Sequence, residues 1–276
     1  MMSFSVTQNI NRIDSDTRSL ISQRYHTITK SLNKEFWNSG SDTTHSLYVG
    51  SYGRGTAIST SDIDILLELP KNEYNRYDTL KGNGQSRLIQ AVKESILSRY
   101  PNTDIHGNGQ VVVVKFSDGM KLELLPAFKH TGIWGDVMYI YPDSNMGGNW
   151  RSTNPKKEQE TMKNKNKPEE SNGLFFDTCK QIRYVRNKCF SSYHLSGIVI
   201  DTFVYNYIGS WHWLRESESK SNNTITFEET MLNQFNSETV NGTFSPVWRA
   251  PGSGMEVNTK DSIECLGKVW QKMAEE

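Results

Sequence analysis

The sequence predicts an α+β protein: a mixed sheet backed by helices, followed by a mainly helical C-terminal lobe. Three observations lead to this prediction. Segments with helical spacing alternate with short apolar runs up to residue 125. An Asp-Gly pair at residues 118–119 separates two strand-like runs at 111–116 and 120–125, which is a hairpin signal. Beyond residue 172, helical spacing returns at 174–187 and again at 196–213.

The elements of the N-terminal half follow from local patterns. Apolar residues recur at threes and fours, or their multiples, over 13–36 and over 88–96, and Pro101 ends the second helix. Two short apolar strands and two polar loops lie between these helices: strands at 46–49 and 62–69, and loops at 38–46 and 50–61. The order helix, strand, strand, helix, hairpin implies a mixed sheet with helices packed against it.

The C-terminal half has a different texture. Residues 131–172 are rich in Gly, Asn, Pro and Lys with little periodicity, which predicts a long irregular segment with one short helix. Three further helices are expected at 174–187, 196–213 and 262–273, and a polar loop is expected at 215–230. We therefore expect the change from an α/β lobe to a mainly helical lobe at about residue 128, with lobes at 1–128 and 129–276.

Composition argues against several classes of protein. Thirty-one basic residues balance thirty-one acidic ones, which disfavours a protein whose main task is to coat nucleic acid. The three cysteines, Cys179, Cys189 and Cys265, lack metal-ligand spacing and are typical of reduced thiols. No secretory signal and no apolar run near the roughly 18 residues of a membrane span is visible. The expected location is cytoplasmic, with no membrane partner.

The segment 50–64 points to phosphate chemistry. Gly50 and Ser51 follow an apolar run and open a loop of small and hydroxyl-bearing residues, and Asp62 and Asp64 open the next apolar run. Side chains alternate along a strand, so the two carboxylates share one face. Paired carboxylates beside a phosphate-sized loop are typical of a divalent-cation site that handles nucleoside triphosphates.

Glu123 is the candidate for a third carboxylate. It lies inside an apolar strand, where burying an unpaired acid would be costly. If that strand lies beside 62–69, Glu123 converges on Asp62 and Asp64, and two cations roughly 3.5–4 Å apart could serve phosphoryl transfer. Taken singly, the aspartates could be a helix cap or a solvated strand end, and Glu123 could be an exposed edge residue. Their combination favours a metal site.

These residues make the sequence resemble the nucleotidyltransferase superfamily of DNA polymerase beta. Within it, the likeness is to cyclic GMP-AMP synthase, 2′-5′ oligoadenylate synthase and their bacterial relatives, the CD-NTases. The matching residues are Gly50-Ser51, Asp62-Ile63-Asp64 and Glu123-Leu124-Leu125-Pro126-Ala127-Phe128. The family often has Asp where this chain has Glu123, a mild departure. The segment 149–155 also looks like one that the bacterial enzymes carry, and the likeness covers roughly 45–210. The resemblance implies a polymerase-beta-like catalytic core at 1–128, whose N-terminal helix packs across both lobes, and a helical nucleotide-binding lobe at 129–276. It also implies an active site in the interlobe cleft.

A second stretch of resemblance, at 191–195, is to cyclic GMP-AMP synthase. The family uses a serine there for the triphosphate and the following tyrosine for stacking on a base, which implies these roles for Ser192 and Tyr193. The family's triphosphate-binding lysine corresponds best to Lys180, which shares one helical face with Arg183 and Asn187 by spacing. A solvated basic face and ordinary core packing of Tyr193 are the alternatives.

The resemblance implies a nucleotidyltransferase that uses two Mg²⁺ ions, with Mn²⁺ as a substitute. It would condense nucleoside triphosphates, as donor and acceptor, into a cyclic di- or trinucleotide second messenger with release of pyrophosphate, in bacterial anti-phage signalling. A downstream effector would be reached through the product, a regulatory protein partner is left open, and no feature requires nucleic acid. One alternative is a same-fold enzyme that modifies a small molecule, a protein or an RNA end. The other is a non-catalytic nucleotide-sensing or nucleic-acid-binding module, which three acids and zero net charge disfavour.

Overall fold

The computed structural model describes residues 4–9, 11–132, 135–216, 218–219 and 224–275, and the chain divides into two compact units. The unit that we call the core unit comprises residues 14–53 and 61–155. The other, the helical unit, comprises residues 1–13, 54–60 and 156–276. The expected boundary at 128/129 therefore lies instead at 155/156, because the strands that follow residue 128 hydrogen-bond to the core sheet.

The core unit is built on a mixed sheet that, in the described residues, has seven strands. In spatial order the first five are β1 (Ser46–Val49), β2 (Ile63–Glu68), β5 (Lys121–Thr131), β4 (Val111–Lys115) and β3 (Asp104–Asn108). β2 and β5 run parallel and the other neighbours run antiparallel. The second half of β5 pairs with β6 (Val137–Asp143), which pairs with β7 (Asn149–Thr153). A short 3-10 helix, η1 (Asn145–Gly147), joins β6 to β7.

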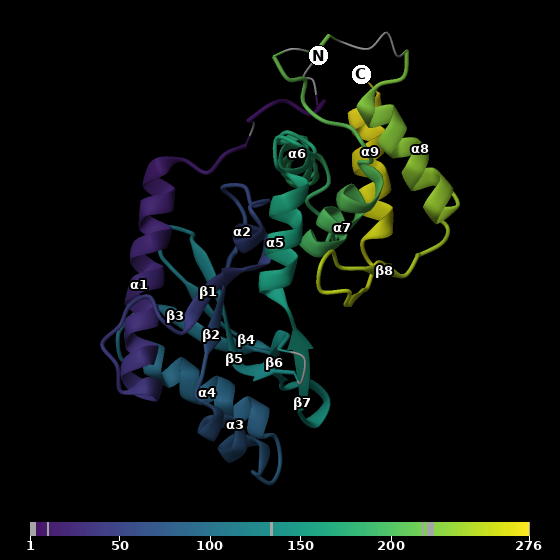
Figure 1. The fold of residues 1–276 in the computed structure, drawn as a ribbon. Coiled ribbons are helices and arrows are strands. Elements are labelled where there is room, and N and C mark those ends of the chain that lie inside the picture. Colours follow the sequence, from purple (N-terminus) through teal and green to yellow (C-terminus); the bar gives the residue numbers. More distant parts are fainter. Residues whose placement is uncertain (1–3, 10, 133–134, 217, 220–223, 276) are drawn as a thin grey trace. The chain divides into compact units, whose positions relative to one another are not determined.

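Four helices complete the described part of the core unit: α1 (Ser15–Trp37), α2 (Gly50–Arg54), α3 (Lys71–Asp78) and α4 (Gly84–Leu97). The last residue of α2, Arg54, already belongs to the helical unit. α1 begins at Asp14, whose side chain accepts a hydrogen bond from the backbone N–H of Thr17. α1 and α4 pack against each other and against strands of the sheet (Figure 1). Their buried faces carry residues such as Ile28 and Val92, both fully inaccessible to solvent.

The predicted helices, the two strands and the hairpin of this unit are confirmed, and the prediction for 131–172 is wrong. That segment contains β6, β7 and the helix α5 (Pro155–Lys165) rather than a long irregular stretch. Aromatic contacts hold it: the Trp150 ring lies 4.8 Å from Tyr74 and 5.7 Å from Phe128. The loop expected at 50–61 contains α2, and α3 and β3 were not predicted. β3 has one buried residue, Ile105, so it lacks an apolar pattern and owes its form to pairing with β4.

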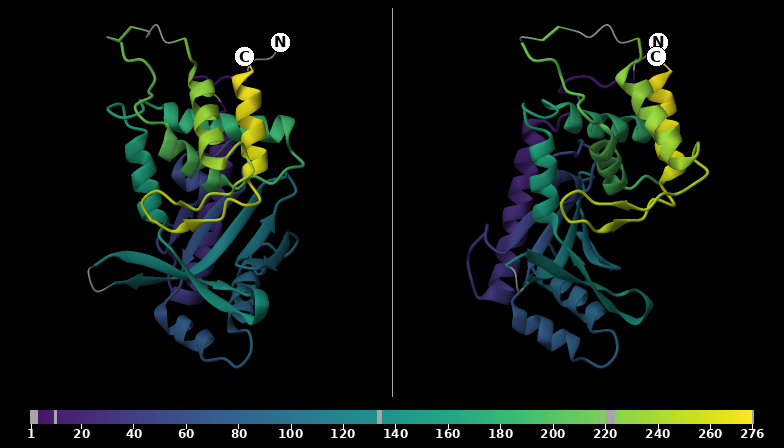
Figure 2. Two further views of the ribbon diagram at one scale, coloured as in Figure 1. Left: turned by 90° about the vertical axis from the view of Figure 1, so that its right-hand side faces the viewer. Right: turned by 45° about the vertical axis from the view of Figure 1, so that its right-hand side comes forward.

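The helical unit packs its helices around large apolar side chains. Besides α5 these helices are α6 (Leu174–Cys189), α7 (Gly197–Tyr207), α8 (Phe227–Thr239) and α9 (Ile263–Ala274), and β8 (Trp248–Arg249) pairs with β9 (Glu256–Val257). Phe175, Phe203 and Trp270 are fully buried in the centre. α8 and α9 lie side by side in every view (Figure 2). In the described residues no helix has the length and apolar character needed to cross a membrane.

Three helices were expected here, and the structure confirms all three with one revised end. The helix expected at 196–213 ends at Tyr207, and α8 begins at Phe227 inside the segment expected to be a polar loop at 215–230. The polar residues before Phe227 conceal this start, which Thr226 and Glu229 mark as a capping box. Part of the predicted loop lies outside the described residues.

Candidate active site

The core sheet brings Asp64 and Glu123 next to each other. They are register partners on the parallel strands β2 and β5, and Asp62 lies one residue before β2. Because the pleat sends alternate side chains to opposite faces, Asp64 and Glu123 share a face, while Ile63 and Ile65 point into the core on the other. The predicted adjacency of these two strands is confirmed.

Gly50 lies directly against Asp64. β1 and β2 are antiparallel with Val49 opposite Asp64, so the chain leaves β1 beside this carboxylate. Gly50 has φ of +57°, and a β-carbon added there would lie 1.8 Å from Asp64 Oδ2. Only glycine satisfies both the left-handed backbone and the close approach. Ser51 follows as the second residue of α2.

Lys121 occupies a position among the carboxylates that sequence reasoning missed. Its Nζ lies 2.8 Å from Asp62 Oδ2 and 2.6 Å from Glu123 Oε1. Burial alone would lower the pKa of Lys121, but its hydrogen bonds to Asp62 and Glu123 outweigh burial and raise that pKa. Lys121 is therefore a cation at neutral pH. The available signal was its place two residues before Glu123, on the same strand face.

Lys180 and Arg183 differ in the helical unit, although spacing predicts one face for both. Lys180 is partly buried on α6, its Nζ lies 6.0 Å from the Phe176 ring, and burial lowers its pKa. Arg183 is buried, and its Nη1 lies 2.8 Å from Asp201 Oδ1. The expected shared basic face is therefore wrong for Arg183, because a partner on α7 draws it into the core. Asn187 donates a hydrogen bond to Thr60.

Ser192 and Tyr193 follow α6 in a turn. Ser192 is exposed, whereas Tyr193 packs partly against the apolar core of the helical unit. Lys268 Nζ lies 5.1 Å from the Tyr193 ring centroid, and the Phe190 ring meets that ring edge-on at 6.4 Å. The backbone carbonyl of Tyr193 accepts two hydrogen bonds from Arg186, the shorter at 2.7 Å. The turn is thus anchored to the last turn of α6, with the Ser192 hydroxyl accessible.

Comparison with protein families decides the family. The model of the Second Messenger Oligonucleotide or Dinucleotide Synthetase domain, abbreviated SMODS, matches residues 4–166, more than half of the 276 residues. The chain belongs to the SMODS family. Its expected kinship with enzymes that make oligonucleotide second messengers is thereby confirmed. Comparison with curated proteins gives no match.

Solved structures support the fold of this SMODS chain. CdnE, the cyclic dinucleotide synthase of Elizabethkingia meningoseptica, has 14% identity and a TM-score of 0.63 over 94% of this chain and 91% of its own. The CdnE c-UMP-AMP synthase of Rhodothermus marinus has 13% identity and a TM-score of 0.60 over 95% of each chain. DncV, the cyclic AMP-GMP synthase of Vibrio cholerae, has 11% identity and a TM-score of 0.58 over 96% and 84%. The expected nucleotidyltransferase fold, α+β with a helical C-terminal part, is confirmed.

The donor set of the SMODS chain suits a hard divalent cation, although its present geometry holds an ammonium instead. Across the described residues, no three His, Cys, Asp or Glu side chains are grouped to hold one metal ion. The Lys121 ammonium stands between Asp62 and Glu123 and satisfies one oxygen of each. Mg²⁺ prefers oxygen ligands such as carboxylates. Here the oxygens of Asp62 and Glu123 already surround a positive charge. These residues therefore fit the metal that the sequence predicts.

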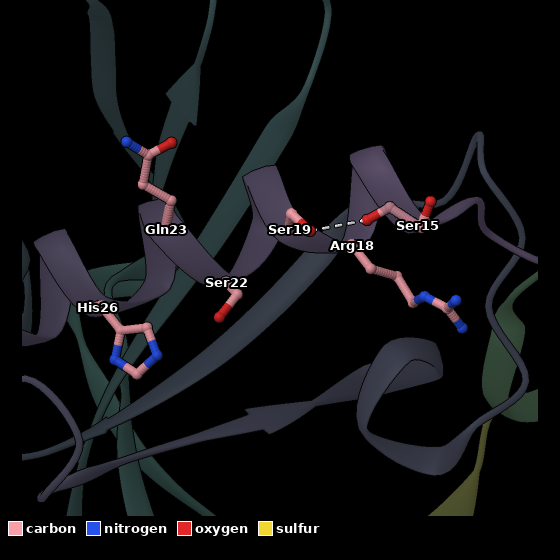
Figure 3. A pocket seen from close by; sticks show the side chains of 6 residues that line it. All are labelled: Ser15, Arg18, Ser19, Ser22, Gln23 and His26. Carbon is pink, nitrogen blue, oxygen red and sulfur yellow. Dashed lines mark hydrogen bonds between the residues drawn. The ribbon is translucent and has the colours of Figure 1, made fainter.

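A surface hollow along α1 is a separate feature. It is lined by polar side chains of that helix: Ser15, Arg18, Ser19, Ser22, Gln23 and His26. In Figure 3, Arg18, Ser22 and His26 point to one side of α1, and Gln23 points to the other. Burial raises the pKa of Tyr52, and the Arg18 cation opposes that rise. None of the predicted site residues lines this hollow.

Proposed function

We propose that this chain condenses nucleoside triphosphates into a cyclic di- or trinucleotide, with Asp62, Asp64 and Glu123 as its catalytic carboxylates. The observation that carries the proposal is the pairing of Asp64 with Glu123 on parallel strands, with Gly50 packed against Asp64, in a SMODS-family chain. Three acids at the beginnings of two neighbouring parallel strands, beside a glycine turn, are suited to phosphoryl transfer between nucleotides.

In this proposal the carboxylates hold the metal and the glycine turn holds the phosphates. Asp62, Asp64 and Glu123 would hold two Mg²⁺ ions, with Mn²⁺ as a substitute. A divalent cation bound there supplies Lewis-acid stabilisation of the α-phosphate and of the departing pyrophosphate. Gly50 lets the backbone approach the triphosphate, and the Ser51 hydroxyl donates to it. The oxygen of a ribose hydroxyl of the acceptor forms a bond to the α-phosphorus and loses its proton to water, while the bond from the α-phosphorus to pyrophosphate breaks. Rate enhancement comes from orientation and electrostatics.

The helical unit contributes three nucleotide contacts in this proposal. Lys180 is partly desolvated, since burial lowers its pKa, so its ammonium gains more from an anionic phosphate than a fully hydrated one would. Ser192 presents an exposed hydroxyl for phosphate. Tyr193 presents an aromatic ring for a nucleobase. The likeness of 191–195 to cyclic GMP-AMP synthase supports these last two assignments.

The wider role is proposed from the family. The product would activate a downstream effector during phage infection, and the enzyme would work in the cytoplasm. The similar Rhodothermus and Vibrio enzymes are a c-UMP-AMP synthase and a cyclic AMP-GMP synthase, so enzymes of one fold join different combinations of nucleotides. The bases used by this chain are therefore a matter for experiment.

The test is incubation of the purified chain with radiolabelled ATP, GTP, CTP and UTP plus Mg²⁺, followed by phosphatase treatment and chromatography. We expect a phosphatase-resistant product, because a closed ring has no terminal phosphate. The Asp62→Asn, Asp64→Asn double variant should lose this product and keep its fold, since Asp62 is exposed, Asp64 is not fully buried, and asparagine keeps the size of each side chain.

Asp118→Asn is the matched control. Asp118 is an exposed acid of the same unit, in the turn between β4 and β5, and it pairs with Arg24 at 2.7 Å. Its loss should leave synthesis intact. If synthesis survives the double variant, the catalytic assignment is wrong. Transfer of label to a protein, an RNA end or a small molecule in place of a cyclic product would instead identify a same-fold transferase.

A further inference from the structure

Lys121 makes closer contacts than an ordinary surface lysine. It bridges Asp62, just before β2, and Glu123, on β5, at 2.8 and 2.6 Å, and its side chain is 30% exposed. Lys115 provides the comparison, because it is the register partner of Lys121 on β4. Lys115 Nζ lies 3.9 Å from Asp104, and its side chain is 52% exposed. Two short, charge-assisted contacts in a half-buried position are screened by water much less than one long exposed contact.

The position of Lys121 has a consequence for metal binding. Its ammonium satisfies one oxygen of Asp62 and one of Glu123, the carboxylates that are proposed to bind the divalent cation. Two cations held within a few ångströms repel each other strongly where water is partly excluded. A divalent ion can therefore bind both carboxylates only if the Lys121 ammonium withdraws. Lysine can withdraw without backbone movement, because its charge sits on a flexible four-carbon stem.

We propose that Lys121 is a resident counter-ion of the active site, which neutralises Asp62 and Glu123 in the metal-free enzyme and is displaced when the divalent cation binds. This counter-ion role rests on the metal site assigned under the proposed function. Lys121 then weakens the affinity of the site for free metal. It also stabilises the metal-free site, where the carboxylates would otherwise repel one another. Its role is to set the affinity for the metal, without contact to the reacting atoms.

The experiment is Mn²⁺ titration of the nucleotide-free chain, with free Mn²⁺ measured by electron paramagnetic resonance at constant pH. Lys121→Met should bind Mn²⁺ about tenfold more tightly than the unmodified chain, which corresponds to about 1.4 kcal/mol. Lys121→Arg retains the charge between the carboxylates and should bind as the unmodified chain does. Lys115→Met removes the same charge from the neighbouring strand and should change the affinity by less than about twofold, since exposed charges are screened.

Thermal unfolding gives a second readout. Without metal, Lys121→Met should unfold at a lower temperature than the unmodified chain, and saturating Mn²⁺ should raise its transition temperature by more. An Mn²⁺ affinity of Lys121→Met equal to or weaker than that of the unmodified chain would overturn the proposal. It would also fall if Lys121→Arg bound as tightly as Lys121→Met, because charge would then not be the cause.

The Asp62→Asn, Asp64→Asn double variant separates this proposal from the proposed function. If the double variant loses Mn²⁺ binding and Lys121→Met changes nothing, the metal site stands and the counter-ion role alone is wrong. If the double variant binds Mn²⁺ as the unmodified chain does, the metal site itself is wrong and both proposals fall.

Discussion

Replacing Asp201 by asparagine removes the charge at the centre of the buried ion cluster in the helical unit. Asp201 is fully buried. Its Oδ2 lies 2.8 Å from Arg54 Nε and 3.0 Å from Thr56 Oγ1, and its Oδ1 lies 2.8 Å from Arg183 Nη1. Asparagine keeps the size of the side chain but leaves two buried guanidinium groups without this carboxylate. Breaking a buried pair in this way destabilises a protein by about 3–5 kcal/mol.

We expect the free energy of unfolding to fall by about 3 kcal/mol, the lower end of that range. Two features limit the loss. Glu158 lies 3.7 Å from Arg54 Nη1 and keeps some negative charge in the cluster. Arg183 also donates hydrogen bonds to the backbone carbonyls of Cys179 and Gly197. A loss of this size is a large share of the free energy of unfolding of a folded domain, which is roughly 5–15 kcal/mol.

The assay is urea unfolding at neutral pH, followed by circular dichroism, with Glu170→Gln as the control. Glu170 belongs to the same unit and pairs with Lys165 at 3.3 Å, but its side chain is 55% exposed. Losing such a pair should cost less than about 1 kcal/mol. If Asp201→Asn destabilises no more than Glu170→Gln, the buried charges do not stabilise this unit as argued.

The same cluster predicts a pH dependence. Burial would raise the pKa of Asp201, but the guanidinium groups of Arg183 and Arg54 outweigh burial and hold that pKa below its ordinary value. A carboxylate with a lowered pKa contributes stability that is complete above its unfolded pKa, about 3.9, and is lost as pH falls through the folded value. The gap in stability between the unmodified chain and Asp201→Asn should be constant from about pH 5 to neutrality and narrow below about pH 4. A gap that widens in acid would refute the assignment.

Two further substitutions test the candidate site. Gly50→Ala places a β-carbon 1.8 Å from Asp64 Oδ2 at a φ of +57°, so kcat should fall about 100-fold through displacement of the carboxylate. Gly82→Ala is the control: Gly82 has a φ of +85°, but a β-carbon there would meet no atom within 4 Å, so this variant should lose stability and keep its kcat. If kcat fell equally in both variants, the clash with Asp64 would not be the cause. Tyr193→Ala should raise the KM for at least one nucleotide about tenfold, as lost base stacking would, and Tyr193→Phe should not. An unchanged KM in Tyr193→Ala would leave the ring with a packing role alone.

Predictability from sequence differs between the two halves of the chain. The helix at 13–36 and the strands at 46–49 and 62–69 carry strong apolar periodicity, and the structure has them within one or two residues. The strand β6 has a β-forming run, Val-Met-Tyr-Ile-Tyr, and was missed because it lies within a segment rich in Gly, Asn, Pro and Lys. The strand β7 was missed because four of its five residues are polar. They form by hydrogen bonding to the end of β5, and the packing of Trp150 against Tyr74 supports them.

The sequence by itself determined the features that depend on neighbours along the chain. Alternation along a strand puts Asp62 and Asp64 on one face, and the turn after β1 puts Gly50 where a small residue is needed. These short motifs also sufficed to indicate the family, because nucleotidyl transfer requires those residue types at that spacing.

Only the tertiary structure decided which charges meet. Lys121 lies between Asp62 and Glu123 because β5 packs parallel to β2, a pairing of segments that are nearly sixty residues apart. Arg183 does not share an exposed face with Lys180, as its spacing suggested, because Asp201, on another helix, binds it in the core. The energy of an ion pair depends on distance and burial in space, and neither quantity is written in the order of residues.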